Sequence, residues 1–154
     1  MTPTAARRRP LLGALALLAT AAALPAGAGA AEGEGRTPSP PGAYLYIGWP
    51  TDGSTVRSPF KVWFGLRNMG VAPAGVERPN TGHHHLIIDT DLPPAGEPIP
   101  SNRSHLHFGA GQTETQLDLP PGRHTLQLLL GDARHVPFDP PVASARIAIT
   151  VVAR

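Results

Sequence analysis

The chain has 154 residues, no cysteine, and a nearly balanced charge of 13 Lys and Arg against 11 Asp and Glu. The lack of cysteine excludes disulfides, thiol catalysis, zinc fingers and iron–sulfur sites. Without Arg7, Arg8 and Arg9, which precede an apolar N-terminal run, 10 basic residues (13 − 3) remain against 11 acidic ones. No basic surface for nucleic acid is therefore expected.

The first thirty residues have the composition of a signal peptide. The three arginines precede an apolar run over residues 11–24, and small residues follow at 26–31. This run is shorter than the about 20 apolar residues that a membrane span needs, so we expect no transmembrane segment in the mature chain. Residues 8–12, Arg-Arg-Pro-Leu-Leu, resemble a twin-arginine signal, and the general secretory route fits as well. We expect export, to the periplasm or the extracellular space.

A flexible tether is expected after the signal segment, over residues 31–43. This stretch is rich in Gly, Pro and Glu and has little apolar surface to bury. A single domain is expected over residues 44–152, which is long enough to form one hydrophobic core.

Seven segments of this domain have the composition or the two-residue alternation of β-strands. They cover residues 44–49, 60–66, 83–89, 105–108, 113–119, 124–130 and 146–152. Proline and glycine turns separate them, and no helical periodicity follows the signal segment. The sequence predicts an all-β domain, an antiparallel two-sheet sandwich of immunoglobulin-like type with about seven strands and no disulfide. A jelly-roll or cupin-like barrel is the alternative, although it needs about eight strands.

Five of the seven histidines fall in two of these segments, Gly-His-His-His-Leu-Ile-Ile-Asp at 82–89 and His-Leu-His-Phe at 105–108. Alternate strand residues project from the same face about 6.5–7 Å apart, so the imidazoles of a His-x-His pair can converge on one ion. His83 and His85 form one pair, and His105 and His107 form the other. If the two strands lie side by side, four imidazoles meet.

Strand phase predicts which way these histidines point. His84 alternates with the apolar Leu86 and Ile88, so we expect it to turn toward the core. His83 and His85 then project from the opposite face, as a ligand site accessible to solvent requires.

The remaining metal-ligand candidates are secondary: His84, His124 and His135. His124 is in phase with core leucines at the start of a strand, and His135 lies in a turn. Imidazole without thiolate favours Cu(II), Zn(II) or Ni(II), and a copper or zinc ion is the expected cofactor. Met69 is the only methionine after the signal segment, which disfavours a Cu(I) carrier.

Catalytic machinery is not recognisable in the sequence. There is no Gly-x-Ser-x-Gly elbow and no cysteine nucleophile. Ser104 and His105 are neighbours in sequence, so their side chains point to opposite faces of a strand. Asp89 and Asp91 have no recognisable partner acid. We therefore expect no catalytic residues.

Several motifs together resemble the bacterial DUF4399 family of exported domains. They are G-H-H-H-L-I-I-D, H-L-H-F-G-A-G-Q-T-E, P-G-R-H-T-L-Q-L and D-A-R-H-V-P, in this order. The resemblance runs from about Tyr44 to Val152 and supports treating this region as one unit. It implies no activity or ligand, because the family is a domain of unknown function.

Three hypotheses follow for the function, and the least favoured is an exported metalloenzyme, which needs a pocket with three ligands and an open coordination position. The first is an exported β-sandwich that binds copper or zinc through the paired histidines, His83, His85, His105 and His107. The alternative is a non-enzymatic cell-envelope module with structural histidines, which binds an envelope protein or a polysaccharide through exposed aromatics such as Trp49 and Trp63. The sequence leaves the oligomeric state open.

Overall fold

The computed structural model describes residues 1–2 and 35–153. The expected signal peptide, residues 1–30, lies outside the described residues except for Met1 and Thr2. The described part consists of strands and loops, and it contains no helix long and apolar enough to cross a membrane. The strands are β1 (Tyr44–Trp49), β2 (Thr55–Arg57), β3 (Phe60–Arg67), β4 (Gly70–Val71), β5 (Thr81–Ile88), β6 (His105–His107), β7 (Glu114–Leu117), β8 (Gly122–Gly131) and β9 (Ile147–Val152).

The smaller sheet contains three antiparallel strands in the order β1-β3-β7. β3 shows the alternation that builds it, because Phe60, Val62 and Phe64 are buried while Lys61 and Trp63 between them are exposed. A strand with one apolar and one polar face must lie over a core on one side and meet solvent on the other.

The larger sheet has the order β2-β9-β8-β5-β4, with β6 also paired to β5. β8 follows the predicted phase, since Leu126, Leu128 and Leu130 are all fully buried. The pairs β2–β9 and β4–β5 are parallel, and the other pairs are antiparallel. β5 lies inside the sheet, between β8 on one side and β6 and β4 on the other.

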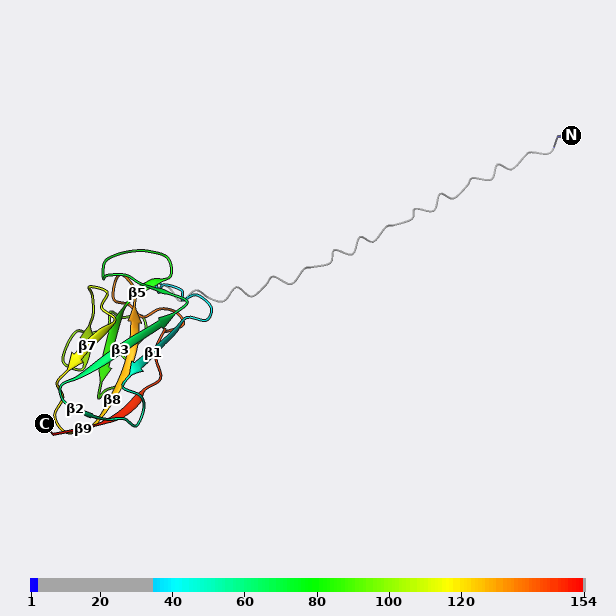
Figure 1. The fold of residues 1–154 in the computed structure, drawn as a ribbon. Helices are drawn as coiled ribbons and strands as arrows, with labels where there is room; N and C mark the ends of the chain where they lie inside the picture. Colours follow the sequence, from blue (N-terminus) through cyan, green and yellow to red (C-terminus); the bar gives the residue numbers. More distant parts are fainter. Residues whose placement is uncertain (3–34, 154) are drawn as a thin grey trace. The chain divides into compact units, whose positions relative to one another are not determined.

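The main core lies between the two sheets, and Figure 1 shows β3 crossing obliquely over β5 and β8. Its buried members come from both sheets: Leu45, Val56, Phe60, Val62, Phe64, Leu86, Ile88, Phe108, Leu117, Leu126, Leu128, Leu130, Phe138, Val142, Ile149 and Val151. Burying a side chain of this kind stabilises a fold by about 1.5–3 kcal/mol, which explains how the domain stays folded without a disulfide.

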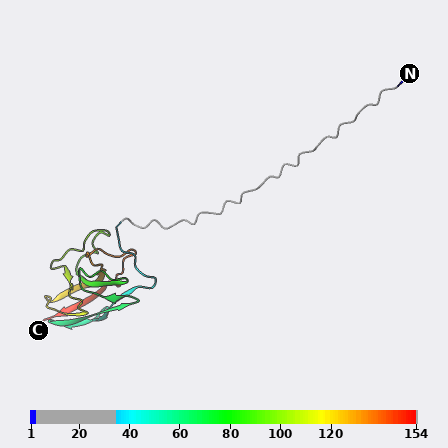
Figure 2. The same cartoon turned by 90° about the horizontal axis from the view of Figure 1, so that it is seen from above.

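Loops cover much of the outer face of the larger sheet, as the view in Figure 2 shows. A second, small cluster joins Ile87 of β5 and Leu129 of β8 to Ile99 of the loop before β6, and Ala143 packs against it. β5 is therefore buried on both faces, although only one faces the main core.

The predicted all-β, two-sheet architecture is confirmed, with nine strands instead of about seven. The additional strands, β2 and β4, are three and two residues long. Strands so short carry no detectable alternation, so composition and periodicity do not reveal them.

Part of the flexible tether expected over residues 31–43 is bonded to the domain, and residues 31–34 lie outside the described residues. Thr37 and Ser39 exchange backbone hydrogen bonds of 2.9 Å with Asp139, and the Arg36 guanidinium lies 3.2 Å from the Asp139 carboxylate. Residues 36–39 are thus part of the folded domain. Their Pro-rich composition hides this, because the stabilising partners lie about a hundred residues away in the sequence.

Candidate metal centre

β5 carries three consecutive histidines, and their side chains lie on the two opposite faces of the larger sheet. His84 points toward the main core, where its ring lies 5.2 Å from the Phe64 ring between centroids. His83 and His85 share the opposite face, with ring centroids 4.8 Å apart. This is the orientation that strand phase predicts.

Two further imidazoles complete a group that we call the histidine cluster: His83, His85, His107 and His135. His107 comes from β6, where it pairs directly with His85, and its ring centroid lies 5.0 Å from that of His83. His135 comes from the loop after β8, and its ring centroid lies 4.9 Å from His83 and 4.8 Å from His107. Four imidazoles from three separate segments therefore meet at one point.

One nitrogen from each of His83, His107 and His135 can be chosen so that all three lie within 4.8 Å of one another. Tetrahedral ligands at zinc–nitrogen distances of about 2.0–2.1 Å would be about 3.3 Å apart. Modest rotations of the rings would therefore bring the three nitrogens to one ion. His85, 5.1 Å from His107 between centroids, stands beside them as a fourth imidazole.

The cluster is buried, so the expectation of a solvent-accessible face is wrong for its β5 members. His83 and His85 each have 0% exposure. The cause is the loops around them: Gly75 donates a hydrogen bond to the Ala133 carbonyl, and Ile99 donates one to the His135 carbonyl, each at 2.9 Å. Only His107 and His135 remain partly exposed.

Several buried nitrogens of the cluster have no hydrogen-bond partner among the described residues. They are both ring nitrogens of His83, both of His85, and Nε2 of His107. A neutral imidazole offers one donor and one acceptor, and leaving a buried polar group unsatisfied costs about 1–3 kcal/mol. Buried unsatisfied nitrogens gathered in one place are typical of a ligand site, although both ring nitrogens of His84, outside the cluster, are unsatisfied as well.

The electrostatics of the cluster keep His83, His85 and His107 neutral, the form that ligates metal. Burial, followed by the neighbouring His135 and His107, lowers the pKa of His83 to about 4. Burial, followed by His83 and His107, lowers the pKa of His85 to about 3. Burial and His135 also lower the pKa of His107. The lone pairs therefore stay free of protons at neutral pH.

Two glycines leave room for the rings. A Cβ on Gly131, the residue of β8 opposite His83, would lie 2.9 Å from Cε1 and 3.3 Å from Nδ1 of His85. A Cβ on Gly109 would overlap the His107 ring. Neither glycine has a positive φ, so their lack of a side chain serves close packing and not backbone conformation.

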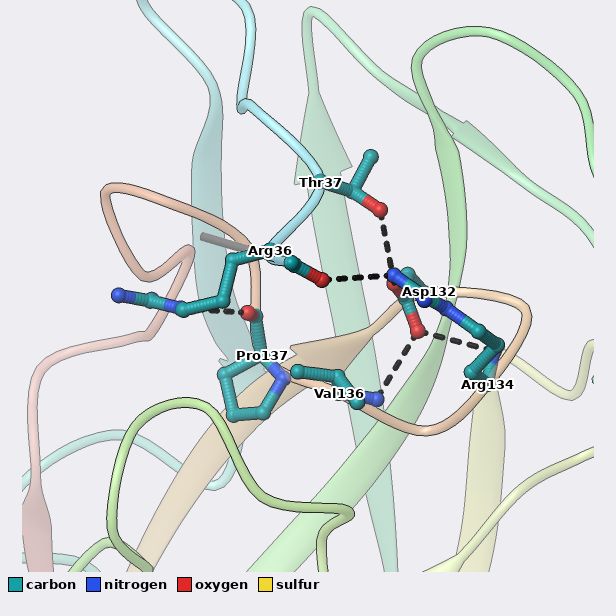
Figure 3. Close-up of polar contacts among 7 residues, drawn as sticks. Arg36, Thr37, Asp132, Arg134, Val136 and Pro137 are labelled. Atoms are coloured by element: carbon teal, nitrogen blue, oxygen red, sulfur yellow. Dashed lines mark hydrogen bonds and ion pairs between the residues drawn. The ribbon is translucent and has the colours of Figure 1, made fainter. Parts of the chain in front are cut away.

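Asp132 organises the loop that presents His135. Its carboxylate accepts hydrogen bonds from the backbone N–H groups of Arg134 and Val136, each at 2.9 Å, and from the Thr37 hydroxyl at 2.7 Å (Figure 3). Burial opposes ionisation of this carboxyl, but these hydrogen bonds outweigh it and hold its pKa below the usual range. The loop backbone also places His135 at φ 69°, a left-handed conformation that needs such support.

The N-terminal segment, residues 35–37, is also hydrogen-bonded to the segment that carries His135. Besides the Thr37 bond, the Arg36 side chain donates a hydrogen bond to the Pro137 carbonyl, and Arg134 donates one to the Gly35 carbonyl (Figure 3). Arg36 also donates to the Phe138 carbonyl. A pocket of about 390 Å³ beside these hydrogen bonds is lined by Thr37, Val76, Glu77, Arg78, Pro79, Thr81, Asp132, Ala133 and Arg134. The clustered imidazoles are not among its lining residues.

Two of the sequence-derived candidates lie elsewhere. His105 is bound to its own turn, with Nδ1 3.2 Å from the Asn102 side-chain oxygen, and it makes no ring contact with the cluster. His124 lies 2.7 Å from the Asp89 carboxylate and 2.9 Å from the Pro120 carbonyl. Of the four principal candidates, the structure therefore brings together His83, His85 and His107, and the fourth member of the cluster is His135.

The comparisons agree with the resemblance inferred from the residues. The model of DUF4399, a domain of unknown function, matches residues 62–152. Comparison with curated proteins gives no match. Among solved structures, the endo-beta-1,4-mannanase from Thermotoga petrophila is similar with a TM-score of 0.43 and 17% identity, over 73% of this chain and 20% of the mannanase chain. The chain thus spans about a fifth of that enzyme, and a similarity of this size carries no conclusion.

Proposed function

This chain belongs to the DUF4399 family, and we propose that it binds one divalent transition-metal ion in the histidine cluster after export. His83, His107 and His135 are the proposed ligands, and His85 is the fourth imidazole. The observation that carries the proposal is the convergence of these rings with buried nitrogens that no group among the described residues satisfies.

The chemistry of the donor groups limits which metal ions the cluster can bind. A set of neutral imidazoles without thiolate or ligating carboxylate suits Cu(II) or Zn(II), and the Irving–Williams order predicts tighter binding of Cu(II). The ionised Asp132 contributes a nearby negative charge that acts on His83 and also favours a cation. A copper or zinc ion is therefore the proposed occupant.

The proposed role is binding and not metal-assisted catalysis. A catalytic ion keeps an open coordination position for water or substrate, and with three ligands that position would lie beside a fourth imidazole. Here the fourth imidazole, His85, has 0% exposure and stands next to the other three. The lining of the adjacent pocket also excludes the cluster.

Calorimetry tests the proposal directly. The exported protein, free of any affinity tag and stripped with chelator, is titrated with Cu(II) and with Zn(II). We expect one ion per chain, with Cu(II) tighter. His107→Gln and His135→Gln should each weaken binding at least about tenfold, since even outer-shell partners of a metal are worth about 10–100-fold in affinity.

His105→Gln is the matched control, because His105 lies on the same short strand as His107 but bonds to Asn102. Its affinity should equal that of the wild type. A wild-type Kd weaker than about 100 µM, or unchanged affinity in the His107→Gln/His135→Gln double variant, would refute the proposal.

A further inference from the structure

The chain has two tryptophans and two tyrosines, and all four lie on the outer face of the three-stranded sheet. Tyr44, Tyr46 and Trp49 are on β1, and Trp63 is opposite Trp49 on β3. Tyr44 is 55% exposed, Trp63 52% and Trp49 41%. All four phenylalanines are buried instead. Aromatic side chains with a polar group are thus gathered on one outer face, and contiguous exposed apolar patches commonly mark binding sites.

An irregularity in β1 turns Trp49 toward this face. Leu45 and Ile47 pack on the core, and strict alternation would send Trp49 inward after them. The register shifts between Ile47 and Trp49, so that Trp49 lies opposite the outward Trp63. β-bulges of this kind often re-aim a side chain beside a functional site.

The rings of the two tyrosines are stacked and nearly parallel. A Cβ on Gly65 would overlap the Tyr46 ring, so this ring rests against the β3 backbone. The Tyr44 ring is inclined to it by only 18°, with 5.6 Å between centroids. The Arg67 guanidinium carbon lies 5.8 Å from the Tyr46 centroid and offers hydrogen-bond donors beside the rings.

Charges on the same face nearly balance. Glu114, opposite Trp63, lies 3.3 Å from the Lys61 ammonium, and Gln116 is opposite Lys61. Arg67, a further charged side chain on β3, lies over an aromatic ring. A polyanion would need a cluster of unpaired cations, so the surface fits an uncharged partner.

We infer that this face binds a neutral polysaccharide. A pyranose ring has an apolar C–H face that stacks on aromatic rings and hydroxyl groups around its edge, which Arg67 and Gln116 can hydrogen-bond. Exposed aromatic rings on two neighbouring strands can stack on successive sugars of such a chain, whereas protein partners anchor side chains in pockets. The surface lies on the sheet opposite the histidine cluster, so this inference is independent of the metal site.

Affinity electrophoresis of the full chain tests the inference. Native gels contain soluble neutral glycans (mixed-linkage glucan, xyloglucan, galactomannan) or, for comparison, anionic alginate, and cellulose and chitin are tested by pull-down. We expect at least one soluble neutral glycan to retard the protein in the gel, or cellulose or chitin to bind it in the pull-down. The result should be the same with and without EDTA. Trp49→Ala and Trp63→Ala should each weaken this association at least about tenfold, as expected for aromatic hot spots, and Trp63→Phe should retain most of it.

Leu92→Ala is the matched control, because it removes an exposed large side chain away from this face. It should bind as the wild type does, and thermal unfolding checks that every variant is folded. Binding to no neutral glycan, retardation by alginate alone, or equal binding by wild type and tryptophan variants would overturn the inference. So would a wild-type dimer that the tryptophan variants dissociate, since the face would then join two copies of the chain.

Discussion

At the scale of one residue, His85 shows how the proposed metal site lowers the stability of the metal-free protein. Its ring has 0% exposure, both nitrogens lack a partner among the described residues, and burial with neighbouring imidazoles lowers its pKa to about 3. A group kept in this state weakens the metal-free fold. Such costs persist mainly where a ligand offsets them.

His85→Leu should therefore stabilise the metal-free protein. Leucine fills a comparable space without polar atoms, and we expect the free energy of unfolding to rise by about 1–2 kcal/mol because a buried unsatisfied group costs about 1–3 kcal/mol. Urea unfolding in EDTA measures the change, and calorimetry should show weaker metal binding by the same variant. A less stable variant with unchanged metal affinity would show that the His85 ring is a structural residue.

At the scale of elements, β5 and the loop of residues 132–136 contribute to the cluster in different ways. β5 is held on both sides by β8 and β6, so His83 and His85 are fixed by the sheet itself. His135 is on a loop whose conformation depends on Asp132 and, through it, on Thr37. The N-terminal segment therefore stabilises the position of one proposed ligand from outside the cluster.

Thr37→Val tests this link, because it removes the hydroxyl that donates to Asp132 and keeps the side-chain shape. We expect a loss of about 1 kcal/mol in unfolding free energy and a few-fold weaker metal binding, as His135 is held less firmly. Ser39→Ala is the control, since Ser39 bonds the Pro140 carbonyl and not the His135 loop. If both variants bind metal as the wild type does, the hydrogen bond between Thr37 and Asp132 has no influence on the metal affinity.

Periodicity predicted those parts of the fold and site that depend on strand phase. Leu126, Leu128 and Leu130 alternate inward as expected, and the same rule separates His84 from His83 and His85. The position of His135 could not be predicted, because a loop conformation at positive φ brings it to β5. The role of residues 36–39 was hidden in the same way, since their partners lie across the fold.

At the scale of the whole molecule, the histidines titrate in opposing directions. Burial is the largest influence on each of His83, His84, His85 and His107, and the pKa of each is lowered. Burial acts the same way on His124, but its hydrogen bonds to Asp89 and Pro120 outweigh burial and raise its pKa. Four imidazoles thus resist protonation in the folded state, and one favours it.

The metal-free domain should consequently lose stability as the pH falls from 7.5 to 5. The unfolded chain binds protons at its histidines near pH 6.5, while His83 and His84 in the folded state do so only near pH 4 and His85 near pH 3. Because the unfolded state then holds more protons, acid favours unfolding, and the contribution of His124, which grows as the pH falls, offsets only part of this loss. Calorimetric scans in EDTA should show a falling Tm over this range and a smaller fall in His85→Leu. A Tm that stays level or rises toward pH 5 would contradict the neutral, unsatisfied state of the histidine cluster from which the metal proposal starts.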